Sequence, residues 1–134
     1  MTMNDDGIVS LKLRDGAEIN ERNYADYAER AIRENRLATG RLTTTALRRV
    51  YGYIINVNTQ IDCESDFESH CSDVQYLKVR MAYESGRERS MKEFLEKTDL
   101  MRAVNAVKDY PQFQLFCRYA ESLVAYFKFY GGRD

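Results

Sequence analysis

Five acidic side chains in one short segment are the first residues of this chain whose spacing could do chemistry. They fall at positions 1, 3, 5, 7 and 12, which resembles the ligand spacing of a calcium-binding loop: Asp62, Glu64, Asp66, Glu68 and Asp73. Such a loop needs glycine at position 6 and glutamate at position 12. This segment has Phe67 at position 6 and Asp73 at position 12. We therefore expect no calcium site. We expect the carboxylates to cap and favourably charge the start of a helix.

Residues that bind zinc or act as nucleophiles are few. Three cysteines, Cys63, Cys71 and Cys117, and the single histidine, His70, lack the pairwise spacing of a zinc site. Every Cys–His or Ser–His catalytic pair would have to use His70, and no glycine-rich phosphate loop or GxSxG motif is present. We expect no metal, no cofactor and no catalytic residue. An enzyme would need a reaction centred on His70 or a cysteine and is the least favoured class.

The composition is that of one globular domain. The chain has 134 residues, of which 44% are hydrophobic and 31% charged. It has no apolar run long enough for a transmembrane helix, and its first residues lack the basic and apolar regions of a secretory signal. Three cysteines are an odd number, so we expect reduced thiols in a cytoplasmic protein with no membrane partner.

Arginine is the remaining residue type whose pattern indicates a function. The net charge is −1, yet the segment from Arg30 to Arg49 contains six arginines against one glutamate. Further along, Arg80 and Arg87 share one face of a predicted helix with Tyr76 and Tyr83. Arginine beside aromatic rings suits phosphate contacts and stacking, whereas a charged helix face is usually only solvated. These residues alone leave nucleic-acid binding and a helical interaction module both open.

Hydrophobic periodicity predicts an all-α fold, a compact bundle of about five helices. Residues 1–19 have a weak pattern and predict a flexible N-terminal arm, and residues 20–134 predict the helical domain. Asn20, Thr43 or Thr44, and Asp109 or Tyr110 are the expected caps. A capping residue before a fresh apolar run favours a break at Thr98–Asp99. The expected helices cover about residues 21–37, 44–60, 66–85, 88–107 and 111–130.

The last of these helices shows where a lysine among aromatic residues must lie. Its apolar residues repeat at spacings of 3, 4, 3, 4 and 3, which predicts a buried stripe: Phe113, Phe116, Ala120, Leu123, Phe127 and Tyr130. Lys128 falls on the other side of the helix with Glu121 and Ala125. We therefore expect Lys128 on a solvated face rather than in the core.

Three segments occur in the order LTTTALRRVYGYI, LKVRMAYESGRE and FQLFCRYAESLVAYFKFYGG. Together they resemble the small subunit of the type III-A CRISPR effector, the Csm complex, over about residues 41–132. The long polar N-terminal region and the acidic segment 62–73 depart from the family pattern. The matching positions are Leu42, Thr43, Thr44, Leu47 and Arg48, then Leu77, Lys78, Ala82, Tyr83, Gly86 and Arg87, and last Phe113, Phe116, Glu121, Val124, Ala125, Tyr126, Phe127, Lys128, Tyr130 and Gly131.

The resemblance implies a non-catalytic helical subunit of an RNA-guided complex. Its expected partners are the guide RNA, the target RNA, the backbone subunit and other subunits of the Csm complex, and further copies of itself. On this interpretation five cationic residues contact RNA phosphates or lie near them without reading sequence, because base pairing carries specificity: Arg48, Arg49, Lys78, Arg87 and Lys128. The alternative is a helical protein–protein adaptor with no direct RNA contact.

Overall fold

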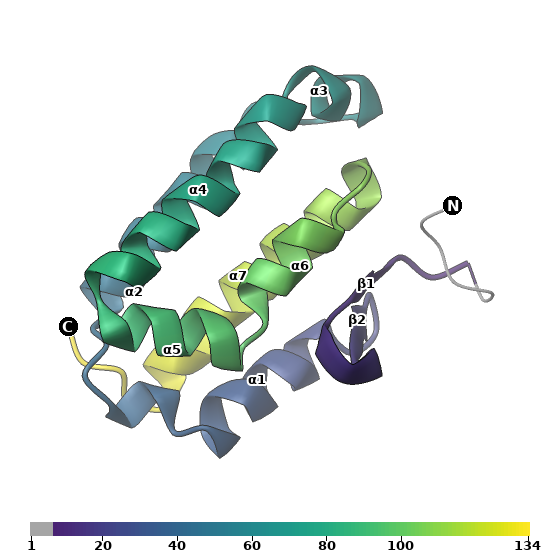
Figure 1. Cartoon of the computed structure of the whole chain (residues 1–134). Coiled ribbons are helices and arrows are strands. Elements are labelled where there is room, and N and C mark those ends of the chain that lie inside the picture. Colours follow the sequence, from purple (N-terminus) through teal and green to yellow (C-terminus); the bar gives the residue numbers. More distant parts are fainter. Residues whose placement is uncertain (1–6) are drawn as a thin grey trace.

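Seven α-helices and a short β-hairpin build residues 7–134, the part of the chain that the structure, a computed structural model, describes. Figure 1 shows α2 and α4 on one side, α6 and α7 in the middle, α1 and the hairpin on the other side, and α5 across one end. The predicted all-α class is confirmed. The elements are β1 (Ser10–Lys12), the 3-10 turn η1 (Arg14–Gly16), β2 (Glu18–Asn20), α1 (Tyr24–Glu34), the 3-10 turn η2 (Leu37–Thr39), α2 (Thr44–Asn58), α3 (Glu64–Ser69), α4 (Cys71–Arg87), α5 (Arg89–Lys97), α6 (Leu100–Ala106) and α7 (Tyr110–Phe129).

The helices α2 and α7 begin at caps that the sequence predicts. The Thr43 hydroxyl accepts a hydrogen bond from Ala46 N at 3.1 Å, and the Asp109 carboxylate accepts one from Gln112 N at 3.0 Å. At the other end of α7, Gly131 adopts a φ of 96°, a left-handed conformation that favours glycine. Gly132 follows so closely that a Cβ there would overlap the Phe127 ring, so the turn needs glycine at this position too.

Two of the predicted helices are divided in the structure. The segment 66–85 belongs to two helices, α3 and α4, which meet at His70. The segment 88–107 breaks where the sequence favours a break, because Asp99 adopts a left-handed φ of 60° between α5 and α6. The buried Tyr119 hydroxyl donates to the Thr98 carbonyl at 2.6 Å and so satisfies a backbone acceptor at the break.

The first helix begins later than predicted because its expected cap has another role. The Asn20 side chain accepts hydrogen bonds from Arg22 N at 2.8 Å and Asn23 N at 3.0 Å. These bonds close a turn between β2 and α1. The helix therefore has Asn23 as its N-cap and starts at Tyr24.

Residues 8–20 differ most from the expectation of a flexible arm. They form an antiparallel hairpin with Leu11 opposite Ile19, and both side chains are fully buried. The Gln112 amide of α7 donates to the Ser10 carbonyl at 3.0 Å, so the hairpin is also hydrogen-bonded to the bundle. The weak periodicity arises because the short run from Ile8 to Leu11 is buried without alternation. Residues 1–6 of the expected arm lie outside the described residues.

The core is organised around α7, as its predicted stripe requires. Phe113, Phe116, Leu123 and Phe127 have no exposed surface. The rings of Phe94 in α5 and Phe127 meet edge to face at 6.0 Å between centroids. Tyr130, the last residue of the predicted stripe, is half-buried instead, and its hydroxyl donates to Glu29 of α1 at 2.7 Å.

Replacing Leu11 tests whether the hairpin is part of the core. Leu11→Ala removes a fully buried side chain, so the free energy of unfolding in a urea titration should fall by about 2–5 kcal/mol. Lys12→Ala, at the exposed neighbouring position, should change it by less than about 0.5 kcal/mol. Equal stability of the two variants would mean that the hairpin does not contribute to the fold.

Candidate functional site

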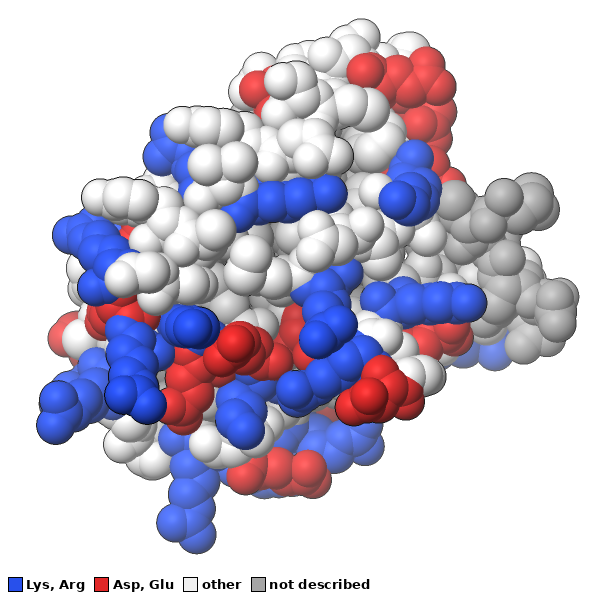
Figure 2. All heavy atoms as spheres, in the orientation of Figure 1, with Lys and Arg blue, Asp and Glu red and all other residues white. Residues whose placement is uncertain are grey.

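The start of α2, the end of α4, the start of α5 and the C-terminus meet at one end of the bundle (Figure 1). Thr44 N donates to the Arg133 carbonyl at 2.6 Å, and an Arg133 guanidinium nitrogen donates to the Arg41 carbonyl at 3.3 Å. Figure 2 shows Lys and Arg side chains projecting from this left and lower end, with Asp and Glu between them. We call this set the basic end: Arg36, Arg41, Arg48, Arg49, Arg87, Arg89, Lys128 and Arg133.

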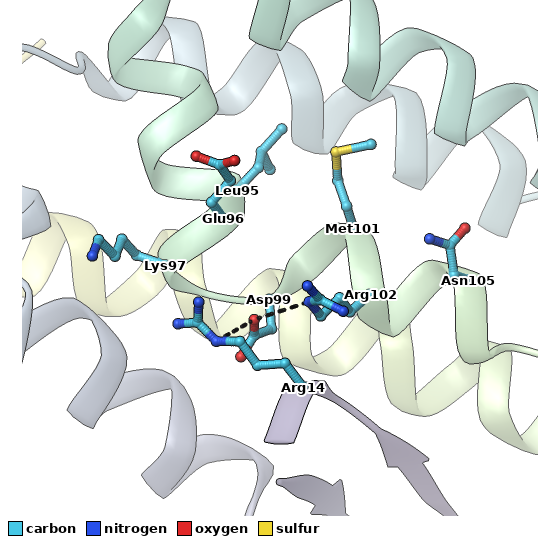
Figure 3. Close-up of a pocket in the computed structure, with 8 residues that line it drawn as sticks. All are labelled: Arg14, Leu95, Glu96, Lys97, Asp99, Met101, Arg102 and Asn105. Atoms are coloured by element: carbon cyan, nitrogen blue, oxygen red, sulfur yellow. Dashed lines mark ion pairs between the residues drawn. The ribbon is translucent and has the colours of Figure 1, made fainter. Parts of the chain in front are cut away.

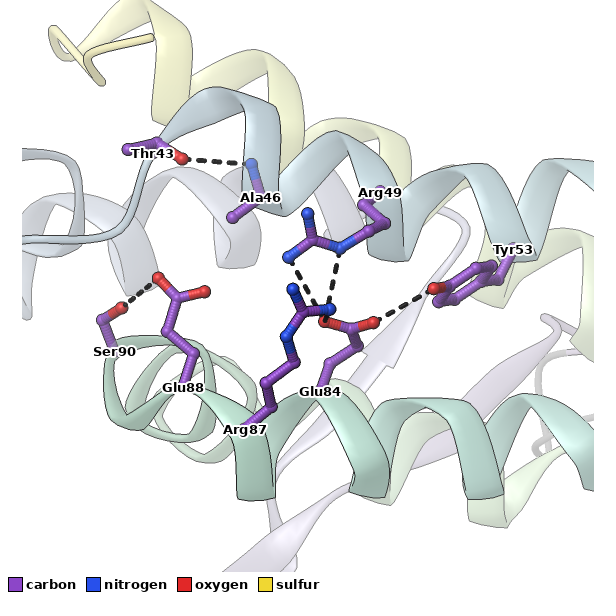
Figure 4. A network of polar contacts seen from close by, with 8 residues as sticks. All are labelled: Thr43, Ala46, Arg49, Tyr53, Glu84, Arg87, Glu88 and Ser90. Atoms are coloured by element: carbon purple, nitrogen blue, oxygen red, sulfur yellow. Dashed lines mark hydrogen bonds and ion pairs between the residues drawn. The ribbon is translucent and has the colours of Figure 1, made fainter.

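Arg49 and Arg87 meet at a buried carboxylate. Glu84 of α4 is only 2% exposed, and its Oε1 lies 3.3 Å from both Arg49 Nε and Nη2, and 3.8 Å from Arg87 Nη1. Its Oε2 accepts a hydrogen bond from the Tyr53 hydroxyl at 3.0 Å (Figure 4). A buried carboxylate needs partners of this kind to compensate for its lost hydration. The network therefore ties α2 to α4.

This network also places Arg49, one of the five cations predicted to contact RNA. Its side chain is half-buried and paired with Glu84. Glu84 was missed as a functional residue. The signal was present, because Glu84 continues the apolar stripe of Leu77 and Met81 at helical spacing. The arginines are not fully neutralised, since their side chains are 36% and 55% exposed and share one carboxylate.

Lys128 lies outside the core, as predicted, at the C-terminal end of α7. Its side chain is 52% exposed, and its Nζ lies 2.9 Å from the Asp134 carboxylate and 3.3 Å from the Gly132 carbonyl. The hydrogen bond from Lys128 and its positive charge lower the pKa of Asp134, and the charge of Arg48 lowers it further. Arg48 itself is exposed and forms no ion pair among the described residues.

The structure separates Lys78 from the other four predicted residues. Lys78 precedes Arg87 by nine residues on α4, which places the two about 180° apart around the helix axis. The side chain of Lys78 is also half-buried. The predicted set therefore divides into four residues at the basic end and one elsewhere.

Four further arginines at the basic end were not among the predicted site residues: Arg36, Arg41, Arg89 and Arg133. Arg36, Arg41 and Arg89 line a hollow of about 390 Å³ together with Ser90 and Glu93. All three are exposed. Arg36 and Arg41 belong to the cationic segment noted in the sequence, but only the fold brings Arg89 beside them.

A second polar cluster surrounds the buried carboxylate of Asp99 and links several elements of the fold. Asp99 is 3% exposed, and its Oδ1 lies 3.1 Å from Arg14 Nε and 3.8 Å from Arg102 Nε (Figure 3). The Tyr27 hydroxyl donates to Oδ2 at 3.3 Å. Burial raises the pKa of Asp99, while Arg14, Tyr27 and Arg102 oppose that rise. Because Arg14 belongs to the hairpin and Tyr27 to α1, this carboxylate joins both to the α5–α6 junction.

The acidic and thiol groups form no metal cluster in residues 7–134. The acidic segment 62–73 contains α3 at the far end of the bundle, where Asp66 accepts from Asp62 N at 2.9 Å and Glu64 accepts from Tyr110 N at 3.1 Å. Cys63 and Cys71 are exposed, and burial raises the pKa of the Cys117 thiol to about 12. Across the same residues, no helix has the length and apolarity needed to span a bilayer.

Comparison with known proteins places this arrangement in a family. The family model Csm2 Type III-A matches residues 19–133, which include every residue of the basic end. The chain belongs to the Csm2 family of type III-A CRISPR systems. It is therefore a small subunit of the type III-A effector complex, as the sequence resemblance implied.

Curated relatives agree with this assignment. A CRISPR system Cms protein Csm2 from Streptococcus thermophilus is 39% identical over 121 residues, covering 88% of this chain and 99% of the relative. Proteins of the same name from Enterococcus italicus and Mycobacterium tuberculosis are 40% and 35% identical. The similarity to the Enterococcus protein covers 66% of this chain and 68% of that relative. The similarity to the Mycobacterium protein covers 69% of this chain and 78% of that relative. These similarities extend over most of the helical domain.

Neutralising Glu84 tests whether the carboxylate holds α2 against α4. Glu84→Gln removes the charge that pairs with Arg49 and Arg87, and should lower the free energy of unfolding by about 1–2 kcal/mol. The cost stays below that of a fully buried pair because both arginines remain partly hydrated. Glu68→Gln, at an exposed position on α3, is the matched control and should be neutral in the same urea titration. A neutral Glu84→Gln would contradict the role given to this network.

Proposed function

We propose that this Csm2-family subunit contacts the phosphate backbone of the guide and target RNA through its basic end and catalyses no reaction. The observation that carries the proposal is the convergence of eight cationic side chains at one end of a chain whose net charge is −1. Four acidic side chains lie among them: Glu84, Glu88, Glu93 and Asp134. The local excess of positive charge attracts RNA although the whole chain has almost no net charge.

The types of these side chains suit phosphate rather than base recognition. Arginine offers several N–H donors in a planar fork, and Glu84 engages only part of the forks of Arg49 and Arg87. Such contacts fix the position of an RNA strand but carry no sequence information. Base pairing between guide and target supplies the specificity in an RNA-guided complex.

The opposite end of the bundle suits a protein neighbour. The segment 62–73 carries five acidic residues, four of them exposed, and Figure 2 shows acidic side chains gathered there at the upper right. In our proposal this end faces a basic surface of the backbone subunit or of another copy of the chain. Complementary charge of this kind directs assembly more than it adds affinity. We place the assembled complex in the cytoplasm.

One observation favours the alternative of a protein adaptor without RNA contact. Arg49, Arg87 and Lys128 each pair with a carboxylate of the same chain, so part of the positive charge is already compensated. If the remaining arginines were only solvated, the same mutations that disrupt RNA binding in our proposal would have no effect. RNA-binding measurements on charge variants therefore separate the two functions.

The first of these measurements reverses the charge of two arginines that form no ion pair within residues 7–134. Arg48→Glu with Arg89→Glu should weaken binding of the full chain to unrelated RNA sequences alike, by about tenfold or more. The unmodified chain should bind with a dissociation constant of about 10⁻⁴ to 10⁻⁶ M. The slope of log affinity against log salt should flatten by about two units.

Lys108→Glu is the matched control for this pair. Lys108 is exposed just before α7, whose 20 residues separate it by about 30 Å from the C-terminal end of that helix. RNA affinity should remain close to that of the unmodified chain. If Lys108→Glu weakened binding as much as the double variant, the basic end would not be the binding surface.

The Lys128–Asp134 pair gives a test in both directions. Lys128→Glu should weaken RNA binding, while Asp134→Asn should strengthen it, because the amide releases the Lys128 ammonium for a phosphate. Helicity and melting temperature should stay unchanged, since Lys128 is 52% exposed. Two variants with unaltered binding would exclude Lys128 from the RNA surface, and an unfolded Lys128→Glu chain would show that Lys128 is structural.

A further inference from the structure

The solvent side of α4 exposes large side chains that a stable helix would not need. Tyr76, Val79 and Tyr83 are 54%, 56% and 65% exposed, and they repeat at spacings of 3 and 4 along one face. The opposite face already buries Leu77 and Met81 in the core. A contiguous exposed stripe of this kind indicates a contact surface rather than a structural need.

The guanidinium group of Arg80 lies over two tyrosine rings. Its guanidinium carbon lies 4.4 Å from the centre of the Tyr53 ring of α2 and 5.2 Å from that of Tyr76. Arg80 forms no ion pair with any carboxylate in the part of the chain that the structure describes. Its charge is therefore uncompensated and is presented together with aromatic faces. We call Tyr53, Tyr76, Val79, Arg80 and Tyr83 the tyrosine patch.

The tyrosine patch continues into the basic end. Its residues line a hollow of about 300 Å³ that also includes Glu84, the carboxylate to which Arg49 and Arg87 are paired. Tyr83 and Arg87 are four residues apart on one helix face, about 6 Å along the axis. On its other side the patch lines a second hollow, which includes the acidic side chain of Asp73.

We infer that the tyrosine patch stacks unpaired nucleobases of an RNA strand while Arg49 and Arg87 hold the adjacent phosphates. Tyrosine rings and a planar guanidinium accept any base, because every base has a π-face. An uncompensated Arg80 at the centre favours an anionic ligand over an apolar protein surface. The inference rests on the proposed RNA function and extends it from phosphate contact alone to stacking of single-stranded segments.

The test uses the full chain and a single-stranded RNA containing 2-aminopurine, with the fully paired duplex of the same sequence for comparison. Stacking should quench the fluorescence of the probe, and the single strand should bind more tightly than the duplex. Tyr76→Ala with Tyr83→Ala should abolish the quenching and weaken single-strand binding by about tenfold or more. Duplex affinity should stay unchanged because the phosphate contacts remain. Tyr76→Phe with Tyr83→Phe keeps the rings and should bind as the unmodified chain does.

Three outcomes would overturn the inference, and they separate it from the proposed function. If the unmodified chain binds neither RNA, the proposed function fails and the inference with it. If the double alanine variant binds and quenches normally, RNA binding stands and the tyrosine patch has no part in it. If this variant keeps all RNA binding but no longer assembles with the other Csm subunits, the patch is a protein-docking surface. Because both tyrosines are more than half exposed, the alanine variant should retain its helicity.

Discussion

Burial of one face of α7 is the constraint on which the rest of the structure depends. That face carries Phe113, Phe116, Leu123 and Phe127, and α1, α2, α3, α6 and β1 all pack on this helix. Helix α4 does not pack on α7 in this way and attaches to it through α2 and α6. Because α7 must end where Gly131 and Gly132 turn the chain, its C-terminus is brought to the start of α2. The basic end is a consequence of that core.

Buried carboxylates then determine how the surface cations are presented. Glu84 fixes Arg49 and Arg87 on neighbouring helices, and Asp99 fixes Arg14 and Arg102 where the hairpin meets the α5–α6 junction. Each acid lies in the core because it has these partners, and each arginine keeps an exposed edge. The chain therefore has little net charge, but the basic end carries an excess of positive charge and the segment 62–73 an excess of negative charge. Such a division suits the proposed contacts with RNA at one end and with protein at the other.

The sequence predicts the helices well where one face is strongly apolar, as in α2 and α7, and less well where burial has no periodicity. Residues 1–19 predict an arm because their pattern is weak and Gly7 and Gly16 flank the short apolar run. The hairpin depends on the turn at Gly16, which brings Leu11 opposite Ile19. The placement of the candidate site residues also depends on packing. Four of the five predicted cations lie at the basic end, whereas Lys78 lies on another face of its helix. Arg89 and Glu84 acquire their roles only from packing between helices far apart in the sequence.

Cross-linking in the assembled effector tests most directly whether the basic end of this subunit contacts guide and target RNA. Guide and target RNA carrying 4-thiouridine would be bound to the complete complex, irradiated, and the cross-linked peptides of this subunit identified by mass spectrometry. We expect cross-links within residues 36–49, 76–93 and 128–134, on the basic end and the adjoining tyrosine patch. Cross-links confined to residues 62–73, or none on this subunit while the backbone subunit cross-links normally, would contradict that expectation.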